Sequence, residues 1–409
     1  MAGAAIRPLP VGSGAAAVHR AGWLVADPDT VLRDGYLVTA GGRVQALGSG
    51  RCPDHGPVTD HGPGVLMPAL TNAHTHLELT ALAGAVTTEG GFLDWVRQLV
   101  TERGAASAGT LTDGAEQGVS QLQADGCGLV GEVSTLGLSW SALSRSPMAG
   151  VWFREALGEA DVPALPEAPV DTATRVAASL AGHAPHTTAP ALLTALKSAA
   201  RRRRQPFAIH LAESAEETDF LTSGRGAWAD FMRQRGIPFD SWPLNGRGPV
   251  AYCRDLGLLD GDTLAVHLLQ AQKGDWRLLA ECGAKVCLCP RSNRLLHGRL
   301  PDVAAMLAAG LRPALGTDSL ASTPSLSIFD EMRYVADNYT EIAPRQILAM
   351  GTVNGAAALG CGERYGRLLP GASAGLVYVD IQAAAEKPLL EAIVAAGEPL
   401  STAATEEAS

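Results

Sequence analysis

Two histidines, His74 and His76, stand one residue apart in the segment TNAHTHLEL, directly after the apolar run GVLMPAL. In a β-strand, alternate side chains point to the same face, so both imidazoles would lie on one side of the strand end. Two imidazoles in that position could hold a metal ion. Two hydrogen-bonded surface histidines would give the same pattern, so the pair predicts a metal site only if further ligands follow along the chain.

Further ionisable side chains occur near the ends of later apolar runs. His210 lies in PFAIHLAES and Glu213 follows it by three residues, while His267 lies in TLAVHLLQ and Asp318 in GTDS. Taken singly, each has an ordinary structural explanation. A lone histidine in an apolar strand is usually a hydrogen-bonded core residue, and a lone aspartate after a strand is usually a helix cap.

Together, three histidines and one carboxylate make a ligand set of three nitrogens and one oxygen, which suits Zn²⁺ and also accommodates Fe²⁺. A metal ion with an open position lowers the pKa of bound water toward about 7, which provides a hydroxide nucleophile. A general acid–base must then move a proton to the leaving group, and Glu213 suits that role. Asp318 could also accept a proton from the water, and His267 could stabilise an oxyanion or orient the water.

The elements that must position these residues alternate between apolar strand-like runs and helix-like segments. Near-continuous apolar runs indicate strands covered on both faces, and eight such units over roughly 250 to 300 residues predict an α/β fold with a (β/α)8 TIM barrel. Active sites of such barrels lie at the carboxyl ends of the strands, where the ionisable residues fall. The expected strands are 64–74, 127–134, 150–158, 175–185, 206–214, 263–270, 284–293 and 312–322, and expected helices include 189–200, 214–235, 271–282 and 301–310.

The two ends of the chain have a different pattern from the centre. Residues 15–64 contain short alternating strands with turns, and residues 362–397 contain the similar segment GRLLPGASAGLVYVD. Neither end is long enough for its own core, so together they predict one composite β-sandwich beside a barrel of residues 65–361. Residues 1–14 and about 398–409, rich in Ala, Gly, Ser and Glu, are expected to be loose tails.

The composition limits the classes of partner. The 409 residues carry a formal net charge of −10, which argues against nucleic-acid binding, and the basic run RRRR at 201–204 indicates a solvated helix end. We expect no membrane span and no signal peptide, because no apolar run has the required length or flanks. Seven cysteines without a Cys-x-x-Cys pair indicate a reduced, cytoplasmic protein. The expected partner is a small-molecule substrate, and a homodimer is left open.

The ordered motifs MPALTNAHTH, HLAES, AVH, CPRSN and GTDS resemble the amidohydrolase superfamily, and within it the deaminase and chlorohydrolase branch. Two-metal members carry a carboxylated lysine at the end of the fourth strand, and RVAASLAGHAP has none, so the resemblance implies one metal ion. The segment SAGLVYVD departs from relatives, which usually have an acidic residue before Leu-Val. The implied roles are His74, His76, His210 and Asp318 as metal ligands, Glu213 as the proton shuttle and His267 as the polarising residue.

Weaker motifs narrow the substrate. The segments GGFLDWVRQL, FREALG, GHAPHTT and SWPLNGRGPVAYCRDLGLL are together similar to the 6-amino-6-deoxyfutalosine deaminases of menaquinone biosynthesis. The resemblance implies hydrolytic deamination of an adenine nucleoside that carries a benzoate on its extended ribose. Alternatives with the same site are deaminases of S-adenosylhomocysteine, adenosine, guanine or a pterin, and chlorohydrolases or cyclic-amide hydrolases. A non-catalytic scaffold barrel is disfavoured, because such relatives usually lose ligands.

Three polar residues are candidates for substrate contact, each with a structural alternative. Glu78 could touch the substrate or support the metal site. His183 could contact the substrate or cap the chain before Pro185, and Ser322 could contact the substrate or cap a helix.

Cations are needed for the benzoate. Arg154 is one candidate, although an ion pair with Glu155 at the strand end explains it equally well. Arg97 and Arg291 are the others.

Overall fold

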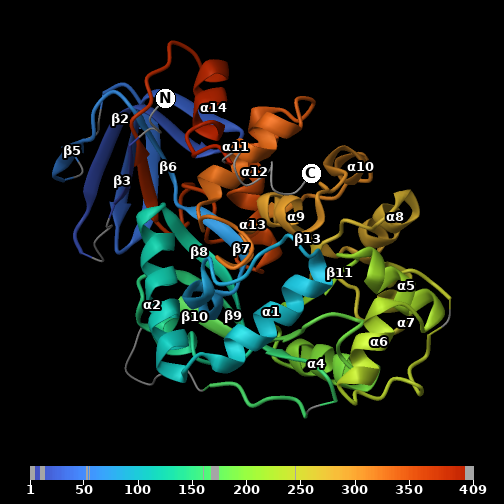
Figure 1. The fold of residues 1–409 in the computed structure, drawn as a ribbon. Coiled ribbons are helices and arrows are strands. Elements are labelled where there is room, and N and C mark those ends of the chain that lie inside the picture. Colours follow the sequence, from blue (N-terminus) through green and yellow to red (C-terminus); the bar gives the residue numbers. More distant parts are fainter. Residues whose placement is uncertain are drawn as a thin grey trace.

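An eight-stranded parallel sheet forms the centre of the computed structural model, in the order β14-β13-β12-β11-β10-β9-β8-β7 (Figure 1). The amides of Thr317 and Asp318 donate to the carbonyl of His74 at 3.0 and 3.1 Å, so the first and last strands meet. The sheet therefore closes into the predicted barrel. The residues described are 5–9, 14–51, 54, 56–159, 161–166, 175–244 and 246–400. The barrel strands are β7 (Leu70–Thr75), β8 (Cys127–Ser134), β9 (Ala149–Ala156), β10 (Arg175–Gly182), β11 (Phe207–Leu211), β12 (Thr263–His267), β13 (Lys285–Leu288) and β14 (Ala314–Leu315).

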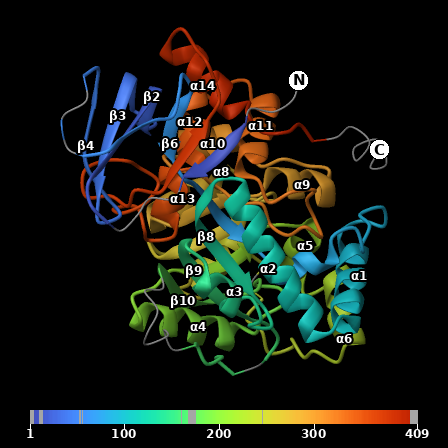
Figure 2. The ribbon, with the colours of Figure 1, turned by 90° about the vertical axis from the view of Figure 1, so that its left-hand side faces the viewer.

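Helices lie around the outside of the barrel (Figures 1 and 2). They are the 3-10 helix η1 (Leu77–Leu82), α1 (Phe92–Ala105), α2 (Ala108–Ala124), α3 (Trp140–Arg145), α4 (Pro190–Arg202), α5 (Ala215–Ser223), α6 (Ala227–Gln234), α7 (Pro249–Asp255), α8 (Lys273–Cys282), α9 (Pro290–His297), α10 (Val303–Ala308), α11 (Ile328–Asn338), α12 (Pro344–Met350), α13 (Val353–Ala358) and α14 (Glu386–Val394).

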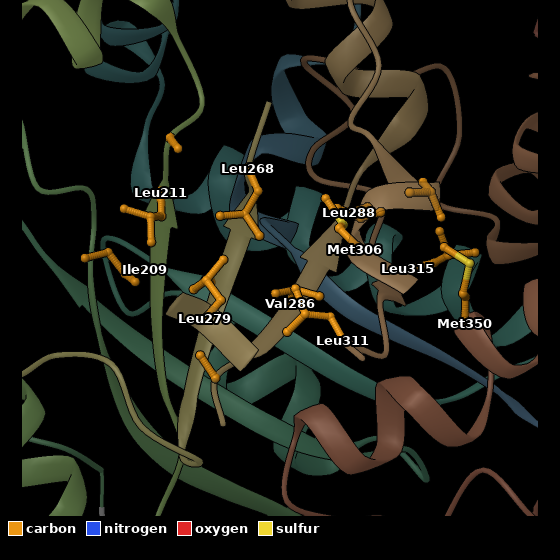
Figure 3. Packing of buried hydrophobic residues seen from close by; sticks show 14 of the residues in the cluster. Ile209, Leu211, Leu268, Leu279, Val286, Leu288, Met306, Leu311, Leu315 and Met350 are labelled. Atoms are coloured by element: carbon orange, nitrogen blue, oxygen red, sulfur yellow. The ribbon is translucent and has the colours of Figure 1, made fainter. Parts of the chain in front are cut away.

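The strands bury apolar side chains on both faces. Ile209 and Leu211 of β11 belong to the outer core against the helices, together with Val286 of β13 (Figure 3). Side chains alternate across a strand, so His210 between Ile209 and Leu211 faces the barrel interior. Burying a side chain of this size contributes about 1.5–3 kcal/mol, so this alternation fixes the inward direction of His210 firmly.

The lower part of the barrel interior is filled with apolar side chains. Val151 and Phe153 of β9 and Val266 of β12 pack there with Leu359, which follows α13. The ionisable groups of the site lie at the carboxyl ends of the strands, as in other barrels of this kind.

Both ends of the chain meet in a second sheet beside the barrel (Figures 1 and 2). Its order is β1-β15-β6-β2-β3-β4, with β5 paired to β2. Leu24 and Leu66 point into a small core within this sheet, whereas Trp23, Val25 and Met67 belong to the helical core of the barrel. The strands are β1 (Ile6–Leu9), β2 (Ala17–Asp27), β3 (Thr30–Ala40), β4 (Arg43–Ser49), β5 (Val58–Asp60), β6 (Val65–Pro68) and β15 (Leu376–Val379).

The structure moves two of the predicted domain limits. Residues 65–68 pair with β15 and β2 in the terminal sheet, so the barrel begins at Leu70 and not at residue 65. Residues 6–9 are not a loose tail, because they form β1 and pair with β15. The remaining parts of the predicted tails, apart from residues 5, 14 and 398–400, lie outside the described residues.

The predicted helix over residues 214–235 is wrong in one respect, since it is two helices. Gly224 ends α5 with φ of 67°, and Gly226 precedes α6 with φ of 93°. Glycine adopts these left-handed conformations without steric cost, so the chain turns here. The chain therefore changes direction between α5 and α6, and α6 lies beside the carboxyl ends of the barrel strands.

Other expectations concern the surface and the cysteines. The basic run at 201–204 is exposed where α4 ends, and Arg201 pairs with Asp260 at 2.7 Å. The six cysteines among the described residues are free thiols. None of the helices in the described ranges has the length and apolar character that a membrane crossing requires.

A buried ion-pair network ties the loop after β14 to α9. Arg291 is 2% exposed and donates from Nε to Glu331 at 2.8 Å, from Nη1 to Asp330 at 3.2 Å and from Nη2 to the carbonyl of Ser325 at 2.9 Å. Its guanidinium is therefore occupied by the protein itself. The hypothesis that Arg291 binds a substrate carboxylate is wrong.

Replacing Arg291 with alanine should destabilise the fold, because Glu331 would keep a buried carboxylate without its cation. We expect a loss of about 3–5 kcal/mol, visible as a lower midpoint of thermal unfolding. Arg294→Ala, on an exposed position of the same helix, is the matched control and should change stability by no more than about 0.5 kcal/mol. Equal midpoints for the two variants would contradict this assignment.

Candidate metal centre and active site

Four buried side chains from the ends of three barrel strands converge at one point. The Nε2 atom of His210 lies 3.3 Å from that of His76 and 3.2 Å from that of His74. Oδ1 of Asp318 lies 3.7 Å from Nε2 of His76 and 3.9 Å from Nε2 of His74. The structure thus brings together all four predicted metal ligands.

Hydrogen bonds orient two of these ligands. Nδ1 of His210 donates to the carbonyl of His183 at 2.7 Å, which leaves Nε2 with a lone pair facing the other ligands. Oδ2 of Asp318 accepts hydroxyl hydrogen bonds from Ser292 at 2.7 Å and Ser322 at 2.9 Å, which leaves Oδ1 facing the histidines. Such outer partners fix the tautomer and direction of metal ligands.

The donor set fits a divalent metal ion. Two imidazole nitrogens bound to one tetrahedral Zn²⁺ would lie about 3.3 Å apart, given Zn–N distances near 2.0–2.1 Å. The separations of 3.2 and 3.3 Å between the histidine nitrogens match this value. Burial and the neighbouring histidines hold the pKa of His74 well below its usual range, and they also lower that of His210. Neutral imidazoles with converging lone pairs are the form that binds metal.

Left-handed backbone conformations place two of the polar residues. Leu264 and Val266 face the barrel interior, so alternation alone would send His267 outward. At His267 φ is 75°, and the ring instead lines the cavity with its centroid 5.3 Å from that of His210. Asp318 has φ of 62°. Non-glycine residues in this region cost of order 1–3 kcal/mol each and cluster at functional sites.

Glu213 lies beside the metal ligands but not among them. Its Oε1 lies 3.2 Å from Nε2 of His297 and 3.7 Å from Nε2 of His267. Burial raises the pKa of Glu213, but His267, His297 and His210 outweigh it and hold this pKa far below its usual range. The amide of Glu213 donates to the buried Glu217 at 2.7 Å, which fixes the turn. Glu213 is therefore an oriented, ionised carboxylate that can take up a proton.

His267 has a fixed tautomer. Nδ1 of its ring contacts Oδ1 of Asn293 at 2.9 Å, so Nδ1 carries the proton and Nε2 faces the cavity. Asn293 and His297 stand four residues apart on α9 and so share one face of that helix. The four-residue spacing of Asn293 and His297 in NRLLH was a signal that both could face the site. The contact of His297 with Glu213 was not predictable, because the two residues are far apart in the sequence.

Two of the predicted substrate residues hold the loop after β8. Glu78 accepts hydrogen bonds from the amides of Leu136 at 3.0 Å and Leu138 at 2.6 Å, and from the hydroxyl of Ser134. Arg154 donates to the carbonyls of Ser134 and Thr135 in the same loop. Neither lines the active-site cavity. Both support its wall.

The parity of β9 explains why Arg154 faces away and its neighbour Glu155 faces inward. Val151 and Phe153 point into the barrel, so Glu155 follows them and lines the cavity. Its Oε2 accepts from the hydroxyl of Thr135 at 2.7 Å, while buried Oε1 has no hydrogen-bond partner among the described residues. On sequence grounds, Glu155 was named only as an ion-pair partner of Arg154 and was not predicted as a cavity residue, although the alternation along β9 indicates its inward direction.

The other two candidates differ in position. His183 lines the cavity, and its Nδ1 contacts the hydroxyl of Thr187 at 2.6 Å. Burial lowers the pKa of His183 to about 3, so the ring is neutral. Ser322 reaches the centre only through Asp318, so its role is to orient a ligand.

A cavity of about 260 Å³ opens above the metal centre. Its inner end holds His76, His210, His267, Glu213 and Asp318, and its outer part runs between α1 and α6. Trp95 belongs to its wall, with its indole nitrogen donating to the carbonyl of Ala321 at 3.1 Å.

Comparison with known proteins agrees with this geometry. The amidohydrolase family profile matches residues 65–405, and the chain belongs to this family. A 5-methylthioadenosine/S-adenosylhomocysteine deaminase from Nitratidesulfovibrio vulgaris is 30% identical over 388 residues, covering 89% of this chain and 83% of the relative. An aminodeoxyfutalosine deaminase from Deinococcus radiodurans is 28% identical over 313 residues, covering 72% and 73%.

A solved structure shares the fold. Helicobacter pylori aminofutalosine deaminase in complex with methylthio-coformycin superposes with a TM-score of 0.79 at 22% identity, covering 92% of this chain and 95% of that one. The barrel with its added terminal sheet is thus a known arrangement.

The ligand set predicts graded effects on metal content. His210→Ala removes a nitrogen donor and should leave less than one ion in ten chains, whereas Ser322→Ala should weaken metal affinity by about 10–100-fold without abolishing it. Metal content would be measured by elemental analysis after dialysis against a chelator series. Wild-type protein should hold one ion per chain, and His19→Ala in the terminal sheet should match it. Two tightly held ions in the wild-type chain would overturn the assignment.

Proposed function

We propose that this chain is a metal-dependent hydrolytic deaminase of adenine nucleosides, and that its substrate is 6-amino-6-deoxyfutalosine, an intermediate of menaquinone biosynthesis. The products would be futalosine and ammonia. The observation that carries the proposal is the cavity, which joins a metal-ligand cluster with an ionised Glu213 to a long apolar section. The names of the relatives support the reaction class, and one of them supports the substrate.

The metal ion would be held by His74, His76, His210 and Asp318. We propose zinc, with iron as the alternative, because three nitrogens and one carboxylate oxygen suit both. When bound, the ion would acidify a water molecule for attack on the purine.

Glu213 would move the protons. As the water oxygen bonds to purine carbon C6, Glu213 takes one water proton and delivers it to ring nitrogen N1. The second water proton then passes to the amino group, the bond from C6 to that nitrogen breaks, and ammonia leaves. Adenine plus water thus gives hypoxanthine plus ammonia, with Glu213 unchanged. His267, whose Nδ1–H is held by Asn293, would accept a hydrogen bond from the attacking water at Nε2 and so orient it.

The cavity wall offers groups for the nucleoside. Oε1 of Glu155 has no hydrogen-bond partner among the described residues and lies 3.9 Å from Nδ1 of His210. The pKa of Glu155 is lowered, because the nearby histidines outweigh the effect of burial. An ionised carboxylate of this kind would accept hydrogen bonds from ribose hydroxyls. His186 and Trp228 line the same cavity. Their ring nitrogens have no hydrogen-bond partner among the described residues, and Nδ1 of His186 lies 3.9 Å from Oε1 of the buried Glu217.

A second candidate function is deamination of 5-methylthioadenosine or S-adenosylhomocysteine, because a relative of that name is 30% identical to this chain. The metal centre and Glu213 would act in the same way on each of these nucleosides. The outer part of the cavity must therefore distinguish them.

Glu213→Gln tests the proton shuttle. Glutamine keeps the size of the side chain but cannot take up a proton, so turnover should fall at least about 100-fold while metal content stays at the wild-type level. Release of ammonia and the absorbance change from adenine to hypoxanthine would be followed together. A variant that kept most of its rate would move this role to Asp318 or His267.

The substrate is tested by comparing kcat/KM for 6-amino-6-deoxyfutalosine, adenosine, 5-methylthioadenosine and S-adenosylhomocysteine with the same zinc-loaded protein. We expect 6-amino-6-deoxyfutalosine to exceed adenosine by at least about 100-fold, the value of two to three additional binding interactions. If S-adenosylhomocysteine or 5-methylthioadenosine were the best substrate, the second candidate would replace the first.

A further inference from the structure

The outer part of the cavity is lined by one face of each of two helices. Along α1 the lining residues are spaced as on a single helical face, and the same is true of α6. Each face begins with aromatic residues, continues with aliphatic or aromatic ones and ends with an arginine. The residues are Phe92, Trp95, Val96, Leu99, Val100 and Arg103 on α1, and Trp228, Phe231 and Met232 on α6 with Arg235 directly after it.

The two faces begin close together beside the metal centre. The rings of Phe92 and Trp228 lie 6.4 Å apart at the inner end. There Phe92 packs on His297, the partner of Glu213, with ring centroids 4.5 Å apart. A rise of 1.5 Å per residue puts Arg103 about 16 Å along α1 from Phe92, and Arg235 about 10 Å along α6 from Trp228. Each arginine therefore lies at the end of its own lining face that is farther from the metal centre.

Neither Arg103 nor Arg235 has an acidic partner among the described residues, whereas Arg233 on α6 pairs with Asp230 at 3.0 Å. The guanidinium of Arg235 lies over the ring of Phe231 at 5.3 Å, which holds it beside the apolar wall. The acidic residues in the described lining are confined to the inner end, where they are Glu155, Glu213 and Asp318. The outer end is thus cationic without compensating negative charge.

We propose that Arg103 and Arg235 form a binding site for an anionic group at the far end of the nucleoside's 5′ substituent, reached through an apolar linker. This inference rests on the proposed function and specifies its substrate class. A zwitterionic amino-acid tail would place an ammonium beside two guanidinium groups with no carboxylate to pair with it. A neutral thioether tail would leave both arginines unused. A carboxylate on an aromatic linker uses the apolar faces and both cations.

The charge of the tail provides a direct test. The variants are Arg103→Gln, Arg235→Gln and the double variant, with Arg233→Gln as the matched control on the exposed side of α6. For 6-amino-6-deoxyfutalosine, we expect each single variant to raise KM about 10-fold or more with kcat within about twofold, because one charge-assisted interaction is lost. For its methyl ester and for adenosine, KM should stay within about twofold of the wild-type value, and Arg233→Gln should match the wild type with all three compounds.

Equal effects of the arginine variants on the acid and its methyl ester would overturn the inference, since the arginines would then shape the cavity without recognising charge. So would a wild-type enzyme that prefers the ester. Thermal unfolding and metal content of each variant would exclude misfolding.

Failure of the proposed function can be told apart from failure of this inference. If wild-type protein turns over another adenine nucleoside far better, inhibition of that reaction by futalosine and by futalosine methyl ester is measured instead. Inhibition that is stronger for futalosine than for its methyl ester, and that is lost in the double variant, would support the arginine site. The substrate assignment would then be wrong, but the inference about the arginines would stand. Inhibition that is equal for acid and ester would reject the site as well.

Discussion

The hydrogen bonds from the amides of Thr317 and Asp318 to the carbonyl of His74 are the contact on which the site depends. They join the last strand to the first, and two of the residues at this contact, His74 and Asp318, are proposed metal ligands. Close approach at this seam requires a residue without a side chain, because a Cβ at Gly316 would lie 2.7 Å from the carbonyl oxygen of His74. The contact that closes the barrel thus also brings His74 and Asp318 together.

Packing around the seam supplies the stability that the site lacks. Four polar ligands with converging lone pairs, and left-handed backbone at Ala212, His267 and Asp318, are unfavourable by themselves. They are held between two apolar cores. One lies inside the barrel below the ligands. The other lies between the strands and the outer helices, and part of it is seen in Figure 3. Hydrogen bonds from residues such as Ser292 and Ser322 set the direction of individual donor atoms. The cavity above can then vary through α1 and α6 without disturbing the centre.

Much of this arrangement follows from local sequence. Apolar runs ending at or near His74, His210 and Asp318 predict both the barrel and the end of it at which the ligands lie, because the barrel rule needs only the strand ends. Strand alternation further predicts the inward direction of His210. The left-handed conformation that turns His267 inward has no such signal, since neighbouring contacts impose it. The inward direction of Glu155 follows from the alternation of side chains along β9. Arg154 was instead selected from the sequence, because a cation was expected to bind the benzoate. Pairing of residues 65–68 with the distant β15 depends on tertiary contacts.

The central claim is a single metal ion held by His74, His76, His210 and Asp318, with Glu213 outside the coordination sphere. Anomalous X-ray diffraction at the zinc absorption edge, on crystals of the zinc-loaded protein, tests it most directly. The account predicts one anomalous peak per chain, surrounded by the three Nε2 atoms and Oδ1 of Asp318. A peak ligated by Glu213, a second peak, or a peak at the alternative cluster of Glu155, His183 and His210 would contradict it.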